Sequence, residues 1–496
     1  MKKLYFLLLS ITVLPLVYFR LDEGLKRLYN ADEVFHLHYG YLLSVGELPY
    51  RDFYMHFTPF FHYTLVPFFR IMGENLAIYT VARFYAFILF LFTMLVTYKL
   101  GKLLFGKEVG LLSVLTLLVI PLSIEKQIEL RPDNLMIPVF VLGTYFFVQG
   151  LTLPRVRPSD YFKAFFLSGL FLGISFWLLL KIVPGLAGLG ISYLIISFWR
   201  KINRREIIDE IKIILAGFLI PSVPVLLYLL LTNNLTMGLK SIFLYAYLVQ
   251  QNLWFPQNII FYFRPNDVIY GTYKGLPWFL NNFLFLIMFL GIALFTVLAF
   301  SQKNIKGKIK YSILPLPLIL LFLYTFFIRT GFQQYFLPVF PFMAIIVAKI
   351  FWEPYNLLLK KLKFLALLYL VSLLFIFAKS GYDAWINKAL WTNDEIIKIA
   401  GEELRRTNAD DRIFDFKGLY IFRRDGYYNC CNNFLEYIPA LRDMLPSFIE
   451  DMEKNKTKLI VFTPGSPFDR FSQKEADYIK THFSPTDDPM IWERIK

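Results

Sequence analysis

The sequence is poor in charge and nearly free of cysteine. Only 18% of its 496 residues are charged, and Phe alone (54) outnumbers Asp and Glu together (37). A typical globular protein is roughly 25% charged, so this ratio excludes an ordinary water-soluble surface. Coiled-coil, collagen-like and disordered chains are excluded as well, because 19% of the residues are aromatic. The only two cysteines, Cys430 and Cys431, are adjacent, so we expect no disulfide framework.

Long apolar runs take the place of charge. Hydrophobic residues make up 57% of the chain, and the mean hydropathy is +0.51. A bilayer span needs about 20 mostly apolar residues. The first run lacks a small-residue cleavage site and therefore indicates a retained anchor. The sequence thus predicts an α-helical polytopic membrane protein with about eleven spans, at residues 4–19, 79–98, 109–123, 134–150, 164–180, 183–199, 213–231, 283–300, 311–328, 336–350 and 364–380.

The net charge of +15 belongs to the apolar part of the chain. The first 380 residues hold 35 Lys and Arg against 17 acids, whereas the last 116 hold 17 against 20. With the N-terminus inside, the short inner segments carry 21 bases against 6 acids, which is the positive-inside pattern. This orientation explains the basic excess without nucleic acid. It places the tail and two long loops, 20–78 and about 232–282, on the extracytoplasmic side of the cell membrane.

Two domains are expected. Residues 1–380 form the membrane part, and residues 381–496 form a small extracytoplasmic α/β domain with an accessory role. In the second, the patterns predict strands at 411–416, 458–463 and 490–495, and helices at 392–406, 439–454 and 472–482. Thr392-x-x-Glu395 and Ser472-x-x-Glu475 match capping boxes that open helices.

An acid pair opens a predicted helix in the first outer loop. Asn30 is a candidate N-cap, and Glu33, three residues on, fits a capping box, which is a purely structural role. Asp32 lacks that explanation and shares a helix face with His36 and Tyr39. An acid at this place can take a proton from a hydroxyl that attacks an activated carbon.

Four of the five histidines also fall in this loop, at 36, 38, 56 and 62. They raise the possibility of a divalent metal. However, the rings of His36 and His38 leave a helix about 200° apart, so one ion cannot easily use both. We therefore predict neither a metal nor another cofactor, and interfacial packing is the simpler account of these rings.

Three motifs carry a resemblance. They are Asp32-Glu33 followed by Gly46–Phe53 (GELPYRDF) and Thr58-Pro59-Phe60, then Glu129–Leu135 (ELRPDNL), then Gln334–Pro341 (QYFLPVFP). In their order and sidedness these motifs resemble those of the GT-C glycosyltransferases. More narrowly, they are similar to the bacterial and archaeal relatives of protein O-mannosyltransferases and lipid A aminoarabinose transferases. The resemblance covers about 350 residues.

The resemblance implies an inverting transferase that uses a polyprenyl-phosphate-linked sugar and acts on a cell-envelope glycan, lipid or protein. Asp32 is then the catalytic candidate, with Glu33 as its partner and Asp133 as a second acid. A lipid-phosphate donor also needs fixed cations near the outer interface. The expected substrate-binding residues are Arg51, Asp52, Arg131, Lys181, Arg264, Arg329 and Tyr335.

Simpler roles stay open for several of these residues. Arg131 and Asp133 can be an interfacial ion pair, and Lys181 can snorkel to the interface. A transporter or flippase of lipid-linked saccharides is the alternative function, although the two halves of the chain show no internal repeat. A non-catalytic scaffold leaves the acidic motifs unexplained.

Overall fold

The computed structural model describes residues 2–153, 158–252, 275–329, 332–387, 392–415, 420–430, 445–462 and 471–495. Contacts divide the chain into two compact units. The membrane unit consists of Met1–Arg27, Arg83–Pro224 and Pro256–Leu390. The loop-and-tail unit consists of Leu28–Ala82, Val225–Phe255 and Trp391–Lys496. The first outer loop thus groups with the tail, and the predicted division of roles at residue 380 stays a prediction.

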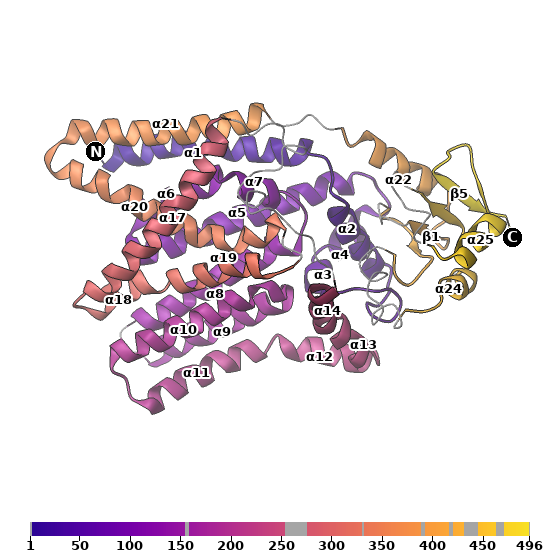
Figure 1. Ribbon diagram of the computed structural model, residues 1–496, viewed down its shortest axis with the longest axis horizontal. Coiled ribbons are helices and arrows are strands. Elements are labelled where there is room, and N and C mark those ends of the chain that lie inside the picture. The colour runs from indigo at the N-terminus through magenta and orange to yellow at the C-terminus, as the bar shows by residue number, and fades with distance from the viewer. Residues whose placement is uncertain are drawn as a thin grey trace. The chain divides into compact units, whose positions relative to one another are not determined.

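The membrane unit is a bundle of long apolar helices (Figure 1). Their apolar composition follows from the bilayer, in which every backbone group must bond within its own helix. The helices and short turns are α1 (Lys2–Lys26), α5 (Ile78–Phe105), α6 (Lys107–Val119), α7 (Pro121–Gln127), α8 (Pro132–Thr152), α9 (Pro158–Leu178), η1 (Leu180–Ile182), α10 (Val183–Arg200), α11 (Arg204–Leu219), α17 (Leu276–Ser301), α18 (Ile305–Ser312), α19 (Pro315–Phe327), η3 (Gln333–Val339), α20 (Phe340–Lys361), α21 (Lys363–Ile386) and the first residues of α12 (Ser222–Leu231), most of which belongs to the second unit.

Ten candidate spans are long and apolar enough to cross a membrane, counted over the described residues. This confirms the predicted fold class and ten of the expected spans. The eleventh, at 109–123, corresponds to α6, which has 13 residues and ends before Pro121. Residues 107–129 nevertheless run along the whole of α1, because the Glu108 carbonyl accepts from Tyr5 near the start of α1 at 2.8 Å and Glu129 pairs with Arg27 just after its end. Proline at the start of α7 explains the break.

Close helix contacts explain the glycines of α9. A Cβ added to Gly169 would lie 1.9 Å from the carbonyl oxygen of Ile214 in α11, and one on Gly173 would lie 2.3 Å from that of Phe218. Only residues without a side chain allow backbones to approach this closely. The Gly169-x-x-x-Gly173 pattern is therefore a packing motif.

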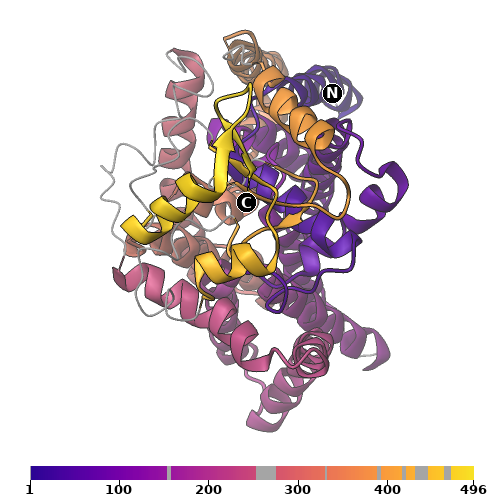
Figure 2. The same ribbon diagram turned by 90° about the vertical axis from the view of Figure 1, so that its right-hand side faces the viewer.

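The loop-and-tail unit combines short helices with a small sheet (Figure 2). Its elements are α2 (Ala31–Ser44), α3 (Phe60–Tyr63), α4 (Val66–Met72), α13 (Leu235–Leu239), the π-helical turn η2 (Lys240–Leu244), α14 (Tyr245–Asn252), α22 (Asp394–Arg406), β1 (Arg412–Asp415), β2 (Arg424–Asp425), α24 (Phe448–Lys454), β3 (Leu459–Val461), α25 (Gln473–His482), β4 (Phe483–Pro485) and β5 (Ile491–Arg494).

The sheet has the order β2-β1-β3-β5-β4. β1 pairs in parallel with β2 and β3, whereas β5 is antiparallel to β3 and β4. The three predicted strands are confirmed as β1, β3 and β5. β2 and β4 were not predicted, because two or three residues carry no readable alternation. Phe414, Ile460 and Phe483 pack with residues of α24 and α25 in the core.

The predicted tail helices are confirmed as α22, the C-terminal part of 439–454, and α25; residues 439–444 lie outside the described residues. The capping box at Ser472 is present in full. The one predicted at Thr392 is wrong, since the N-cap of α22 is Asn393 and its side chain makes no capping hydrogen bond. The Oδ1 atom of Asn393 instead accepts from the Tyr29 backbone N–H, at 2.8 Å.

Candidate functional site

The acid pair lies at the first turn of α2, as predicted. The Asn30 side chain accepts from the Asp32 backbone N–H at 3.0 Å, and Glu33 accepts from the Asn30 N–H at 3.0 Å. Glu33 is buried with 1% exposure, so its carboxylate serves the capping box. Asp32 is half-buried, and its side chain takes no part in that box. Of the two acids, Asp32 remains the candidate for chemistry.

The histidines of the loop lie on different sides of α2. His36 Nδ1 faces His62 Nε2 at 3.0 Å, whereas His38 contacts the tail. The predicted divergence of these two rings is therefore confirmed. Burial lowers the pKa of His56 to about 3, and burial together with His56 lowers that of His62 to about 3. These rings are neutral at physiological pH and act as packing and hydrogen-bonding groups.

The GELPYRDF motif is a compact turn. Asp52 accepts from the Leu48 N–H at 2.8 Å and from Arg51 Nη2 at 2.7 Å. Burial alone would raise the pKa of Asp52, but the bonds from Arg51 and the Leu48 N–H lower it. The Tyr50 backbone is left-handed, with φ of 67°. These contacts give Asp52 a structural role in the turn, while its predicted substrate contact stays untested.

A second group of predicted residues meets in the membrane unit around Glu129, which is fully buried. Arg27 Nη2 donates to Glu129 at 2.5 Å, and Lys126 Nζ at 3.0 Å. Arg131 Nε donates to the other carboxylate oxygen. Burial alone would raise the pKa of Glu129, but Arg131, Lys126 and Arg27 hold it well below its usual range. One carboxylate therefore contacts three cations.

Asp133 and Lys181 form an ion pair beside this cluster. The ammonium of Lys181 also donates to the Gln334 carbonyl at 3.3 Å and lies 5.2 Å from the centre of the Tyr335 ring. Such a cation–π contact is stronger where water is excluded. The structure thus brings Asp133, Lys181 and Tyr335 together, from three predicted regions separated by up to 202 positions in the sequence.

We call the six residues Arg27, Lys126, Glu129, Arg131, Asp133 and Lys181 the cation cluster. It holds four cations against two carboxylates, counted over the described side chains, which leave out that of Glu125. Buried charges are costly, and they are retained where they are paired or serve a function. Arg329 is exposed after the end of α19, and Arg264 lies outside the described residues.

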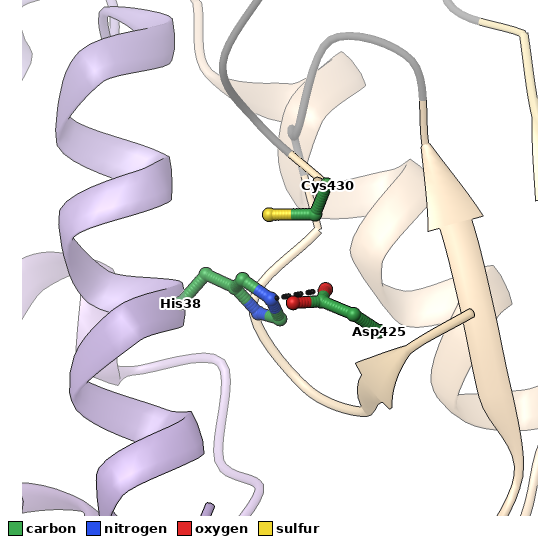
Figure 3. Close-up of side chains that lie close together, drawn as sticks. All are labelled: His38, Asp425 and Cys430. Atoms are coloured by element: carbon green, nitrogen blue, oxygen red, sulfur yellow. Dashed lines mark hydrogen bonds and ion pairs between the residues drawn. The ribbon is translucent and has the colours of Figure 1, made fainter. Parts of the chain in front are cut away.

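One group of three potential metal ligands is present among the described residues: His38, Asp425 and Cys430, which converge in Figure 3. A metal would need the Cys430 thiolate. The sulfur of Cys430 is instead part of a disulfide; Cys431 lies outside the described residues. The ring of His38 also bonds Asp425 directly at 2.8 Å. These residues do not fit a metal site.

Sequence reasoning named Arg131, Asp133 and Lys181 as site residues and missed the other three members of the cation cluster, Arg27, Lys126 and Glu129. Arg27 follows the first apolar run, whereas Lys126 and Glu129 fall in a charged stretch before the expected span at 134–150. The pairing of Arg27 with Glu129 spans 102 positions and has no local signal. The same holds for the 387 positions between His38 and Asp425.

Comparisons with known proteins agree with this arrangement. The model of the family described as dolichyl-phosphate-mannose-protein mannosyltransferase matches residues 56–228. The structure of ArnT from Cupriavidus metallidurans bound to undecaprenyl phosphate matches with a TM-score of 0.64 and 11% identity, over 99% of this chain and 98% of that one. The chain has the GT-C glycosyltransferase fold. The resemblance predicted from the sequence is thereby confirmed.

Two further GT-C structures come from Archaeoglobus fulgidus. Its oligosaccharyltransferase in complex with Zn and sulfate matches with a TM-score of 0.57 and 11% identity, over 96% of this chain and 71% of that one. Its oligosaccharyltransferase AglB, in complex with an inhibitory peptide and a dolichol-phosphate, matches with a TM-score of 0.55 and 11% identity, over 93% and 69%. No curated protein sequence matches the chain. Two of these three structures thus contain a lipid phosphate: undecaprenyl phosphate in ArnT and a dolichol-phosphate in AglB.

Proposed function

We propose that this protein is an integral-membrane glycosyltransferase. It transfers a sugar from a polyprenyl-phosphate-linked donor to a hydroxyl of an envelope glycan, lipid or protein on the extracytoplasmic face of the cell membrane. The sugar is a hexose or pentose, and its anomeric carbon is inverted. A donor that is itself insoluble in water explains why a transferase is built from ten long apolar helices.

The observation that carries this proposal is the cation cluster. Arg27, Lys126 and Arg131 surround Glu129, and Lys181 pairs with Asp133, so four cations meet in buried surroundings. A lipid phosphate is an anion that such a group of cations can bind. Fixed cations also stabilise a phosphate as it leaves the sugar, because they are oriented before the reaction begins.

Asp32 is the proposed base. Its carboxylate takes the proton of the acceptor hydroxyl while that oxygen attacks the anomeric carbon. The bond from this carbon to the donor phosphate breaks, and the polyprenyl phosphate leaves with the electron pair. Asp32 is suited to this step because its side chain is only half-buried. The carboxylate of the capping box is that of Glu33, so the box does not use the carboxylate of Asp32.

Sugar transfer in native membranes tests this proposal. The parent and Asp32→Asn are compared, at equal expression, with a panel of radiolabelled polyprenyl-phosphate sugars. Asp32→Asn keeps the size of the side chain and removes its basicity, so transfer should fall by about 100-fold or more. The matched control is Asp209→Asn, which changes an exposed carboxylate of α11 next to Lys212 and should retain full transfer.

Unchanged transfer by Asp32→Asn would contradict the assignment of the base. If the intact lipid-linked sugar crosses the membrane of vesicles and no sugar is transferred, the protein is a flippase and not a transferase.

A further inference from the structure

Helix α2, which carries Asp32, is attached to the tail at several points within the loop-and-tail unit. At its start, the Tyr29 N–H donates to Asn393 Oδ1 at 2.8 Å. Near its end, Tyr41 packs edge-on against Phe422, with ring centres 5.6 Å apart. Residues after the helix continue the attachment, since Glu47 pairs with Arg424 at 2.8 Å. The loop and the tail are therefore one structural unit around this helix.

The most deeply buried of these attachments is polar. His38 lies in the middle of α2 with 0% exposure, and Asp425 lies in β2 with 3%. His38 Nε2 is 2.8 Å from Asp425 Oδ1, and Nδ1 is 2.8 Å from the Ile421 carbonyl oxygen. Figure 3 shows the ring pointing from the helix toward the carboxylate. Tyr420 donates to the same carboxylate oxygen and stacks obliquely on the ring, 4.4 Å between centres.

Stability alone does not account for such a pair. A buried ion pair is often no better than well-packed hydrophobic residues of the same volume, because both groups lose their hydration. The pair instead fixes the orientation of α2. Both ring nitrogens of His38 face oxygen atoms, and only one rotation of α2 about its axis brings both nitrogens within hydrogen-bonding distance. Asp425 Oδ2 is buried and has no hydrogen-bond partner among the described residues, where the carboxylate is held by the bonds on Oδ1.

We propose that the His38–Asp425 pair positions α2 so that Asp32 is aligned for proton abstraction, which makes the tail part of the catalytic machinery. The inference rests on the proposed function. Six positions separate Asp32 from His38, so their side chains leave the helix about 120° apart and roughly 9 Å along its axis. The pair therefore fixes the helix without occupying the side on which Asp32 lies. His38 and Asp425 are positioning residues.

A double-mutant cycle tests the pair. His38→Gln, Asp425→Asn and the double variant are compared in sugar transfer with varied donor concentration. A displacement of a catalytic group by about 1 Å lowers the reaction rate on the order of 100-fold. Each single variant should therefore lose about 10- to 100-fold in kcat, with an unchanged KM for the donor. The double variant should be no worse than either single one, because the pair acts as a unit. Losses that multiply, or a raised KM with normal kcat, would overturn the inference.

Arg494→Gln is the matched control. Arg494 pairs with Glu453 at 2.5 Å within the tail, between β5 and α24. The control should keep its kcat. Backbone hydrogen exchange should accelerate across 31–44 in Asp425→Asn and stay unchanged in Arg494→Gln. Equal effects of both variants on exchange and kcat would mean that the pair only stabilises the tail.

Asn393→Ala covers the case in which the buried variants do not fold. Asn393 is half-buried, and its loss removes the bond to the Tyr29 N–H at the other end of the helix. The expected result is a several-fold loss of kcat with normal KM and faster exchange at the start of α2; normal kcat and exchange would overturn the inference.

Two further outcomes are informative. If a chelator abolishes transfer by the parent and zinc restores it through His38, a metal site replaces the ion pair. If Asp32→Asn transfers sugar as fast as the parent, the assignment of the base fails by itself, whatever the cycle shows.

Discussion

Glu129→Gln should destabilise the membrane unit strongly and make it dependent on a lipid phosphate. The substitution keeps the volume of the side chain but leaves Arg27, Lys126 and Arg131 around a neutral amide. Removing one partner from a buried ion pair costs about 3–5 kcal/mol. For a large domain, each kcal/mol lowers Tm by roughly 2–4 °C, so Tm should fall by about 6–20 °C.

Polyprenyl phosphate should then restore part of this loss. A ligand at 100 times its Kd adds about 2.7 kcal/mol of stability to any protein that binds it only when folded. In Glu129→Gln the phosphate also supplies the missing negative charge, so the increase in Tm should exceed that of the parent. The assay is thermal unfolding of purified protein in detergent, with and without undecaprenyl phosphate.

Glu210→Gln is the matched control for this experiment. Glu210 is buried like Glu129 and accepts from Arg200 at 2.9 and 3.0 Å and from Tyr193 at 2.9 Å. It lies outside the cation cluster, so its variant should lose stability without a larger response to the lipid. Equal responses of the two variants, or a fully stable Glu129→Gln, would refute the assignment of the cluster to phosphate binding.

Three further predictions concern the fold. Gly169→Val should abolish the packing of α9 on α11, because its Cβ would collide with the Ile214 carbonyl, and folded protein should be lost on size-exclusion chromatography. Asn30→Ala should cost about 1 kcal/mol through the lost cap of α2, visible as a lower Tm. Burial, with Asp415, holds the pKa of Glu403 well above its usual range, so folding opposes its ionisation and stability falls as pH rises from about 4.5. Glu403→Gln should therefore slow hydrogen exchange of α22 increasingly between pH 5 and 8, and a pH-independent effect would contradict this.

Local patterns predicted most of the fold. Apolar length predicted ten of the spans, and alternation predicted β1, β3 and β5. The pattern failed at α6, where Pro121 divides one apolar run into two helices. It also failed at β2 and β4, whose extended backbone is set by pairing partners far away in the sequence rather than by their own residues.

Part of the cation cluster was predicted from the sequence, but the pairing of its members was not. Arg131, Asp133, Lys181 and Tyr335 were expected to bind substrate, and the structure brings them together. The resemblance could not show that Lys181 pairs with Asp133, because such a pairing depends on how α8 packs against η1. Glu33 shows the reverse case, since its capping role follows from three-residue spacing alone.

The most direct test of the central claim measures both products of one reaction. Purified protein in nanodiscs is given a polyprenyl-phosphate sugar and an acceptor, and sugar transfer and free polyprenyl phosphate are quantified together. The account predicts one polyprenyl phosphate released for each sugar transferred, with both rates falling equally in Asp32→Asn. Release of the lipid phosphate without an acceptor product, at a rate independent of Asp32, would contradict it.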